Sequence, residues 1–184
     1  DFINESEGSW ETDTPFPVVK ILSDTLTIAA ATQGESAAAV YSDAGGIVQL
    51  GSEDRKIKKL IFAEDAGANM NLYSDSYMYE ERNNTANARY SDTIAAGKTA
   101  DDYILHPATI DVHAEDAEFH ANTNAINARN NSRINVNATK ADINNKYGNV
   151  ATVSSSGGSK VTIIGEDISI TNHNKNYMHQ GEVT

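Results

Sequence analysis

Three Glu-Asp pairs are the residues of this chain whose type and spacing most directly suggest chemistry. Successive pairs are separated by 51 residues, and they are Glu64-Asp65, Glu115-Asp116 and Glu166-Asp167. Carboxylates stacked on one face of a protein can share a hard cation such as Ca²⁺, which takes about six to eight oxygen ligands. The sequence contains neither the Gly- and Asp-rich calcium repeat nor an EF-hand loop. We therefore prefer a turn position that tolerates acidic residues, with Glu115 and Asp116 as weak candidates for Ca²⁺.

Two histidines flank the middle pair and make residues 113–120 resemble a metal-binding stretch. His113 and His120 are separated by an odd number of residues, so on a single strand their side chains would face opposite sides. A zinc site needs converging ligands, and only a turn between the two histidines would bring them together. The sequence therefore predicts no metal site here.

A Tyr- and Arg-rich segment is the better candidate for a binding site. Tyr and Arg are enriched at binding hot spots because they offer large, flat contact areas and planar hydrogen bonding. The regular alternation of apolar residues lapses in this segment, which indicates an excursion over residues 73–105. The opposing interpretation, which the sequence leaves open, is that the tyrosines only hold a long loop against the body of the protein. The candidate ligand-binding residues are Tyr73, Tyr77, Tyr79, Arg82, Arg89, Tyr90 and Tyr103.

The elements that must position these residues are short strands. Two or three alternating apolar residues, closed by a small residue, recur along the chain, and Asn, Asp or Gly lie between the copies. This repetition predicts an all-β fold, a parallel β-helix or β-solenoid with coils of about 20–25 residues and seven or eight coils in total. The clearest copies are Leu26–Ala30, Val48–Gly51, Leu60–Ala63, Ile110–Ala114, Ile134–Ala138 and Val161–Gly165.

The strand pattern also predicts a domain organisation. We expect a lead-in or cap at residues 1–17, a solenoid at 18–172 that contains the excursion, and a polar tail at 173–184 that leads into a longer chain. Residues 53–59 are charged, and we expect them to form a solvated turn. Between Ala108 and Ser154 we expect separate strands, among them Ile110–Ala114, Phe119–Ala121 and Val150–Val153.

Composition excludes several classes of protein. The 184 residues have a net charge of −12 and no cysteine, the isoelectric point is about 4.7 and the mean hydropathy is −0.48. Because the basic residues are scattered, nucleic acid would be repelled. No apolar run approaches the roughly 18–20 residues that span a bilayer, so we expect no membrane insertion by this segment. Without cysteine, packing and hydrogen bonding must hold the fold together.

The alternating phrases, the Asn, Gly and Asp corners and the absence of cysteine resemble the passenger domains of Gram-negative bacterial autotransporters and haemagglutinin-type adhesins. The phrases most similar to that family are Ile134–Thr139 and Val161–Gly165, and the resemblance covers residues 18–172. It implies a right-handed parallel β-helix that is secreted and displayed on the bacterial outer-membrane surface. Proteins of this kind act in cell adhesion, biofilm formation and virulence.

The resemblance leads to an expected function: an adhesin module that binds a host glycan or an extracellular-matrix protein through the loop off the solenoid. Two alternatives stay open, a self-associating module and a passive stalk. A polysaccharide-degrading enzyme is less favoured, because no paired-acid motif is recognisable. The residues that such an enzyme would use are Asp111, Glu115, Asp116, Arg129 and Arg133. We therefore expect no catalytic residue and no cofactor other than a weakly supported Ca²⁺.

Overall fold

The computed structural model of this chain describes residues 18–29, 38–43, 46–63, 70–75, 108–146, 150–172 and 179–180. These residues form strands joined by turns, and none of them is helical, so the predicted all-β class is confirmed. Within these ranges there is accordingly no helix that could cross a membrane. The predicted lead-in at 1–17 and most of the predicted tail at 173–184 lie outside the described residues.

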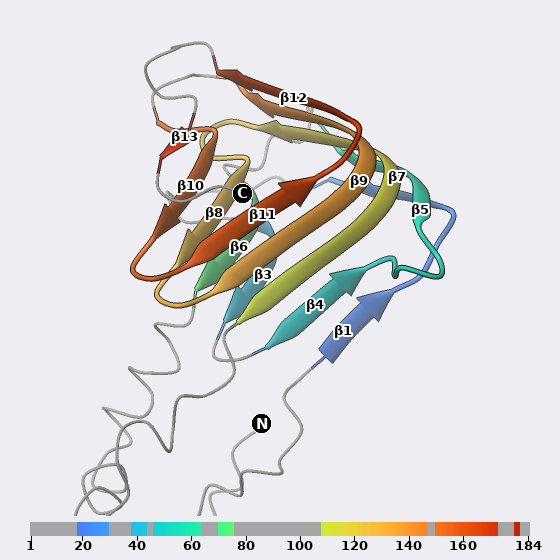
Figure 1. Cartoon of the computed structure of the whole chain (residues 1–184), viewed down its shortest axis with the longest axis horizontal. Coiled ribbons are helices and arrows are strands. Elements are labelled where there is room, and N and C mark those ends of the chain that lie inside the picture. Colours follow the sequence, from blue (N-terminus) through green and yellow to red (C-terminus); the bar gives the residue numbers. More distant parts are fainter. Residues whose placement is uncertain are drawn as a thin grey trace, which may run out of the picture.

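The strands form two sheets in which every pairing is parallel (Figure 1). The larger sheet, sheet A, contains β1 (Val18–Ile21), β2 (Thr25–Ile28), β4 (Ile47–Leu50), β5 (Ile57–Phe62), β7 (Thr109–Ala121), β9 (Arg133–Asn145), β11 (Lys160–Ile164) and β12 (Asp167–Asn172). The smaller sheet, sheet B, contains β3 (Ala38–Asp43), β6 (Met70–Asp75), β8 (Ile126–Arg129), β10 (Val153–Ser156) and β13 (His179–Gln180).

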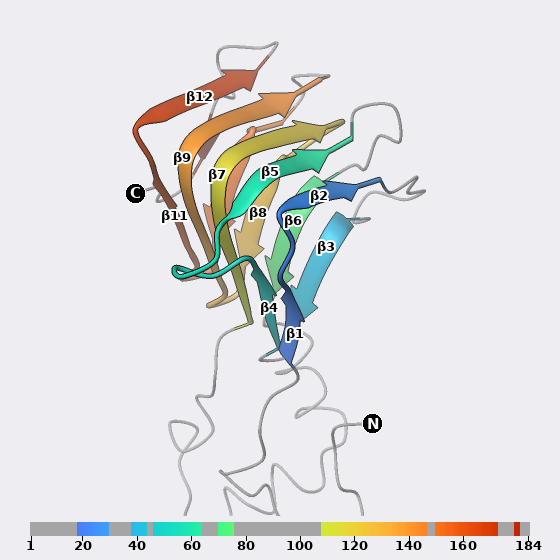
Figure 2. The same cartoon turned by 90° about the vertical axis from the view of Figure 1, so that its right-hand side faces the viewer.

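The chain runs through sheet A, then through sheet B, and then returns to sheet A. We call each such circuit a pass, and there are five among the described residues: β1–β3, β4–β6, β7–β8, β9–β10 and β11–β13. Figure 2 shows the sheet A strands of successive passes lying one above another. Paired residues are 24 to 27 apart from β7 onward, as in Thr109↔Arg133 and Arg133↔Lys160. The described residues therefore make five passes where the sequence predicted seven or eight coils, and residues 76–107 lie outside the described part.

The core lies between the two sheets and is built from columns, by which we mean residues that are paired from strand to strand. Phe62 and Phe119 belong to one column, and their rings stack with centroids 5.1 Å apart. Val112 and Val136 belong to another. Full burial of such a side chain contributes about 1.5–3 kcal/mol. The largest fully buried side chains are those of Leu50, Ile57, Leu60, Phe62, Leu72, Ile110, Val112, Phe119, Ile126, Ile134, Val136 and Ile143.

Strand β7 bends at Glu115–Asp116 without a break, so the prediction of separate strands at Ile110–Ala114 and Phe119–Ala121 is wrong. At the bend two consecutive residues face outward, while Ala114 and Ala117 on either side of them are buried. The bend shifts the two-residue alternation by one position. His113 and His120 therefore both lie on the outward, half-buried side of β7, contrary to the odd-spacing argument.

The turns between sheet B and sheet A confirm the predicted use of Asn and Gly at corners. Asn130 and Asn131 have φ values of 54° and 59°, and Gly157 and Gly158 follow in the next pass with 63° and 76°. Left-handed backbone of this kind favours Gly and Asn. The Asn131 amide donates to the Gly157 oxygen at 2.8 Å, so the two turns are stacked on each other.

Two further strand boundaries differ from the sequence-based prediction. A strand was expected at Val150–Val153, but the strand found there, β10, begins at Val153 and continues to Ser156. The charged stretch 53–59 was expected to be a solvated turn, yet Ile57 is fully buried and begins β5. Its hydrophobic side chain enters the core in a stretch that otherwise reads as polar.

Candidate functional site

Tyr73 is the one predicted ligand-binding residue that the structure describes. It lies in β6, stacked on Tyr41 of the preceding pass with ring centroids 5.1 Å apart. Its hydroxyl donates to Asp75 Oδ2 at 2.6 Å, and only 6% of the residue is exposed. Regular structure therefore continues to Asp75, beyond the point where the alternation lapses. The other candidates lie outside the described residues, namely Tyr77, Tyr79, Arg82, Arg89, Tyr90 and Tyr103.

Burial of the Tyr73 ring, together with its hydrogen bond to Asp75, raises the pKa of this phenol to about 12. A buried, protonated donor that holds a neighbouring carboxylate is typical of a structural contact. Asp75 in turn accepts a hydrogen bond from Asn130 Nδ2 at 2.8 Å. Tyr73 therefore joins the sheet to the corner of the next pass and presents little surface to a ligand. Tyr41 beside it is 45% exposed.

The connection from β6 to β7 differs from the other sheet B to sheet A connections. Ala108 resumes the stack at the position occupied by Ser132 one pass later, since Thr109 pairs with Arg133. Asp75 pairs with Arg129 at the other side of the same corner. In the next pass this corner consists of two residues, Asn130 and Asn131. In the present pass residues 76–107 lie between Asp75 and Ala108. The root of this connection is held by the Ser74 hydroxyl, which donates to the Ala108 oxygen at 2.8 Å.

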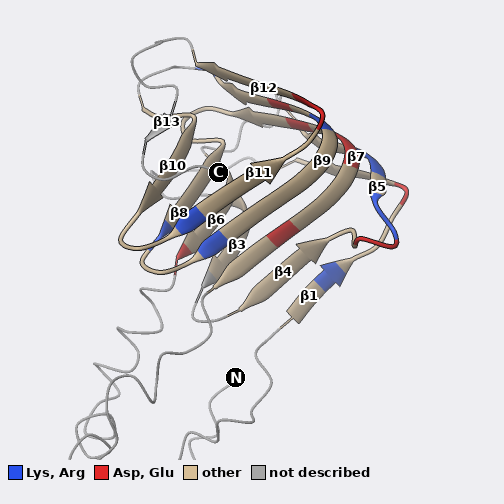
Figure 3. Ribbon diagram, in the orientation of Figure 1, with Lys and Arg blue, Asp and Glu red and all other residues tan. Residues whose placement is uncertain are grey.

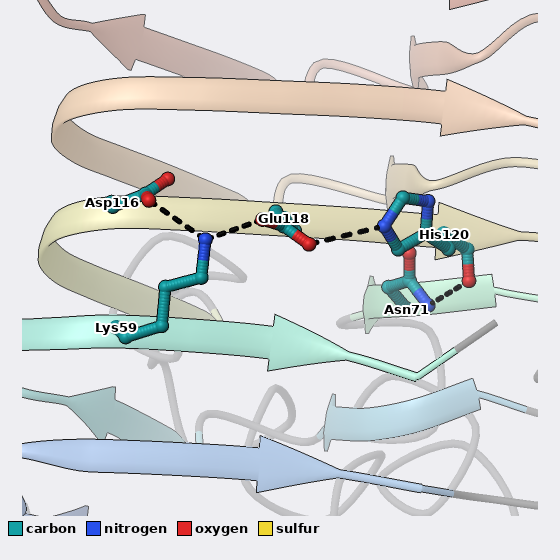
Figure 4. A network of polar contacts seen from close by, with 5 residues as sticks. All are labelled: Lys59, Asn71, Asp116, Glu118 and His120. Carbon is teal, nitrogen blue, oxygen red and sulfur yellow. Dashed lines mark hydrogen bonds and ion pairs between the residues drawn. The ribbon is translucent and has the colours of Figure 1, made fainter.

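Charged residues gather on the outer surface of sheet A beyond the bend (Figure 3). Lys59, Asp116, Lys140 and Asp167 form one column with alternating charge. Lys59 Nζ donates to Asp116 Oδ2 at 2.7 Å and also to Glu118 Oε1 (Figure 4). Hydrogen bonding to these two carboxylates raises the pKa of Lys59, and the Lys59 hydrogen bond lowers the pKa of Glu118.

His120 extends this network toward the end of β7. Its Nε2 lies 3.5 Å from Glu118 Oε2, and its backbone oxygen accepts a hydrogen bond from Asn71 Nδ2 at 2.9 Å (Figure 4). A small hollow beside it is lined by His120, Ala121, Asn122, Asn144 and Lys146. Its volume of about 10 Å³ is the room that one water molecule needs. The hollow is too small for a sugar or a cofactor.

The predicted acidic pairs do lie in one register where the structure describes them. Asp116 pairs with Lys140, and Lys140 pairs with Asp167, so the second and third pairs share a column two passes apart. Two strand spacings amount to about 10 Å, which is too far for one ion. Glu115 is exposed and Asp116 is paired with Lys59. In the described part of the chain no three His, Asp or Glu side chains are grouped to hold a metal ion. Glu64 and Asp65 lie outside it.

Of the residues considered for an enzyme, Asp111 and Asp116 are each held by a different neighbouring side chain. Asp111 Oδ1 accepts a hydrogen bond from Asn135 Nδ2 at 2.7 Å. Arg129 ends β8 and Arg133 begins β9, on either side of the Asn130–Asn131 turn. Sequence reasoning missed Tyr41, Lys59 and Glu118, because their neighbours are visible only once the pairing register is known.

Comparison of the chain with known protein families, with curated proteins and with solved structures finds no match. The class that the structure itself defines is an all-β protein built from parallel sheets.

Proposed function

We propose that this chain is a module of a cell-surface adhesin, built as a right-handed parallel β-helix that displays residues 76–107 to a ligand. The expected ligand is a host glycan or an extracellular-matrix protein, and the expected location is the bacterial outer-membrane surface. The resemblance to autotransporter passenger domains, together with the parallel stacking of the passes, supports this proposal.

The observation that carries the proposal is the unequal length of equivalent corners. A two-residue turn at Asn130–Asn131 closes one pass, whereas residues 76–107 stand at the same corner of the pass before it. A stacked sheet needs only the short turn, so the long connection is not required to close the fold. Long connections of this kind are usually functional. This one contains most of the chain's Tyr and Arg candidates.

The test is a binding screen of the chain against glycans and matrix proteins, beside a variant in which 76–107 is replaced by Asn-Asn. This replacement copies the Asn130–Asn131 turn, so Asp75 and Ala108 can keep their places in the stack. Circular dichroism establishes that the variant is folded. We expect a folded variant that no longer binds. Binding that survives the replacement, or no binding by the intact chain, would contradict the proposal.

A matched point variant sharpens this screen. Tyr73→Phe removes the hydroxyl that holds Asp75 but leaves the buried ring in place. We expect it to bind as the intact chain does, whereas Tyr77→Ala and Tyr90→Ala weaken binding. Equal loss in all three variants would indicate that the tyrosines act only on folding.

A further inference from the structure

Within the described residues, sheet A ends in a strand edge on each side. Among the described residues β1 and β2 pair only with β4 and β5, while β11 and β12 pair only with β9. The two edges lie at opposite ends of the stack (Figure 2). An unpaired edge of a parallel sheet is a template for another strand. What fits on it is decided by register and by side-chain type.

The first and last passes have the same register around the bend. Val18 and Lys160 both align with Thr109 through the intervening strands, and Thr25 and Asp167 both align with Asp116. Of the five passes, the second has five extra residues at this bend, 52–56. The β1–β2 segment of one molecule therefore matches the β11–β12 segment of another, residue for residue.

This match continues the core columns. Continued stacking would place Val19 over Val161, Ile21 over Ile163, Leu26 over Ile168 and Ile28 over Ile170. Val19 is 54% exposed, although its column contains the fully buried Ile110 and Ile134. The core therefore ends at an apolar edge that has the pattern of its own interior.

An outward-facing column gives an independent indication. His113, Asn137 and Ile164 are paired from strand to strand, and Gly51 and Leu22 directly follow the paired Leu50 and Ile21, so the column is polar or small in the middle and aliphatic at both ends. Leu22 is 41% exposed and Ile164 is 59% exposed. Continued stacking would cover each of these side chains with the other. Exposed aliphatic residues that match across two ends favour association between copies.

We propose that a second copy of this chain stacks head to tail on the first, its β1–β2 edge pairing in parallel with the β11–β12 edge. The interface is heterologous, so repetition produces linear filaments. Asp24 would face Glu166 across it, and Asp24 is already paired with Lys58 at 3.0 Å and Arg55 at 3.9 Å. The carboxylates of Asp24 and Glu166 would repel each other across the interface. Salt screens this repulsion and should therefore strengthen the association. The proposal does not depend on residues 76–107 or on their ligand.

Directed cross-linking tests the pairing, because the chain has no cysteine of its own. The double variant Leu22→Cys with Ile164→Cys is treated with a short bis-maleimide, which spans adjacent strands without the geometry of a disulfide. We expect a ladder of covalent dimers, trimers and longer species. Thr27→Cys with Ile164→Cys is the matched control, since both residues are exposed but lie in different columns. No ladder, an equal ladder in the control, or dimers from Leu22→Cys alone would overturn the proposal.

Sedimentation velocity tests the association without cross-links. We expect the mass of the intact chain, and of the variant without 76–107, to rise with concentration. Leu22→Lys and Ile164→Lys should each weaken association about tenfold or more. Thr139→Lys changes an exposed residue in the middle of the stack and should have no effect. A monomer at every concentration, or equal weakening by all three substitutions, would overturn the proposal.

Discussion

The third and fourth passes of this molecule are built from the same columns as the other three but differ from them in continuity. β7 and β9 each run 13 residues through the bend, and the pairing between them is the longest among the described strands. The other three passes are interrupted at the same bend, at residues 22–24 between β1 and β2, at 51–56 between β4 and β5, and at 165–166 between β11 and β12. The difference is one of local sequence at the bend and not of sheet architecture.

Small residues let neighbouring passes approach closely at the bend. Ala114 and Ala138 are fully buried neighbours in one column, and Gly165 follows in the last pass. A Cβ atom added at Gly165 would lie 2.1 Å from the Ala138 oxygen, so the passes approach closely at this point. The second pass replaces this arrangement with Gly51 and a loop. From this comparison we expect the third and fourth passes, which run through the bend without interruption, to contribute most of the stability.

The largest expected loss of stability comes from a core substitution, and two isoleucines of one column allow the passes to be compared. Ile143 is fully buried in the fourth pass, whereas Ile28 is only partly buried in the first. Ile143→Ala should lower the free energy of unfolding by about 2–5 kcal/mol, because it leaves a cavity. Ile28→Ala should cost about 1 kcal/mol, because its site is already open. Urea unfolding measures both, and equal losses would contradict the proposed difference between the passes.

An intermediate loss of stability is expected when alanine replaces either of two glycines that have left-handed backbone, Gly51 and Gly158. At Gly51, with φ of 75°, an added Cβ would lie 2.3 Å from the backbone oxygen of His113. At Gly158, with φ of 76°, it would lie 2.4 Å from the side-chain Oδ1 of Asn131, which can move aside. Gly51→Ala should therefore cost about 2–4 kcal/mol and Gly158→Ala about 1–2 kcal/mol. Thermal unfolding of both variants checks this order. A larger loss of stability in Gly158→Ala than in Gly51→Ala would contradict the expectation.

The smallest expected effect concerns the ion pairs at the bend. Lys59→Met should lower the free energy of unfolding by less than about 1 kcal/mol at pH 7, since the group is about one-third exposed and screened. The pKa of Glu118 is lowered by Lys59, so this contribution is present above the usual carboxyl pKa and lost as pH falls through the folded value. The pKa of Lys59 is raised, so at the alkaline end the contribution is complete below its usual pKa and lost above its folded value.

The matched control for this pair is Lys58→Met, which removes an exposed partner of Asp24. Urea unfolding from pH 7 down to about pH 3 should show a pH-dependent difference between the intact chain and Lys59→Met. The Lys58 variant should show a smaller one. A Lys59 effect that does not change with pH would indicate lost packing of its aliphatic stem instead of lost charge.

Period-two patterns predicted the regular parts of the fold well. Ile134–Ala138 and Val161–Gly165 fall on β9 and β11 and their ends, since each places alternate side chains in the core. The bend in β7 was not predictable in this way, because Ala114 and Ala117 are both buried and the alternation slips between them. The predicted strand in this region ended before the observed end of β6, because β6 shows no alternation of buried and exposed residues. All six of its residues are buried, including the polar Asn71 and Asp75.

The candidate site was predictable only as a location. The lapse of the pattern near Tyr73 falls close to the corner between Asp75 and Ala108, and the structure describes both sides of that corner. The sequence does not show that Tyr73 itself is buried, because that depends on Tyr41 in the preceding pass and on Asp75. The charged column at Lys59 likewise depends on pairings between residues 57 positions apart.

The central claim is that successive passes stack in parallel and in register, and one distance tests it most directly. Glu115 and Glu166 are both exposed and stand at equivalent positions two passes apart, 51 residues along the chain. Spin labels on Glu115→Cys and Glu166→Cys should lie near each other, with backbone positions about 10 Å apart. Strong dipolar broadening in the continuous-wave spectrum of magnetically diluted protein is the predicted result. A spectrum equal to the sum of the two singly labelled proteins would contradict the account.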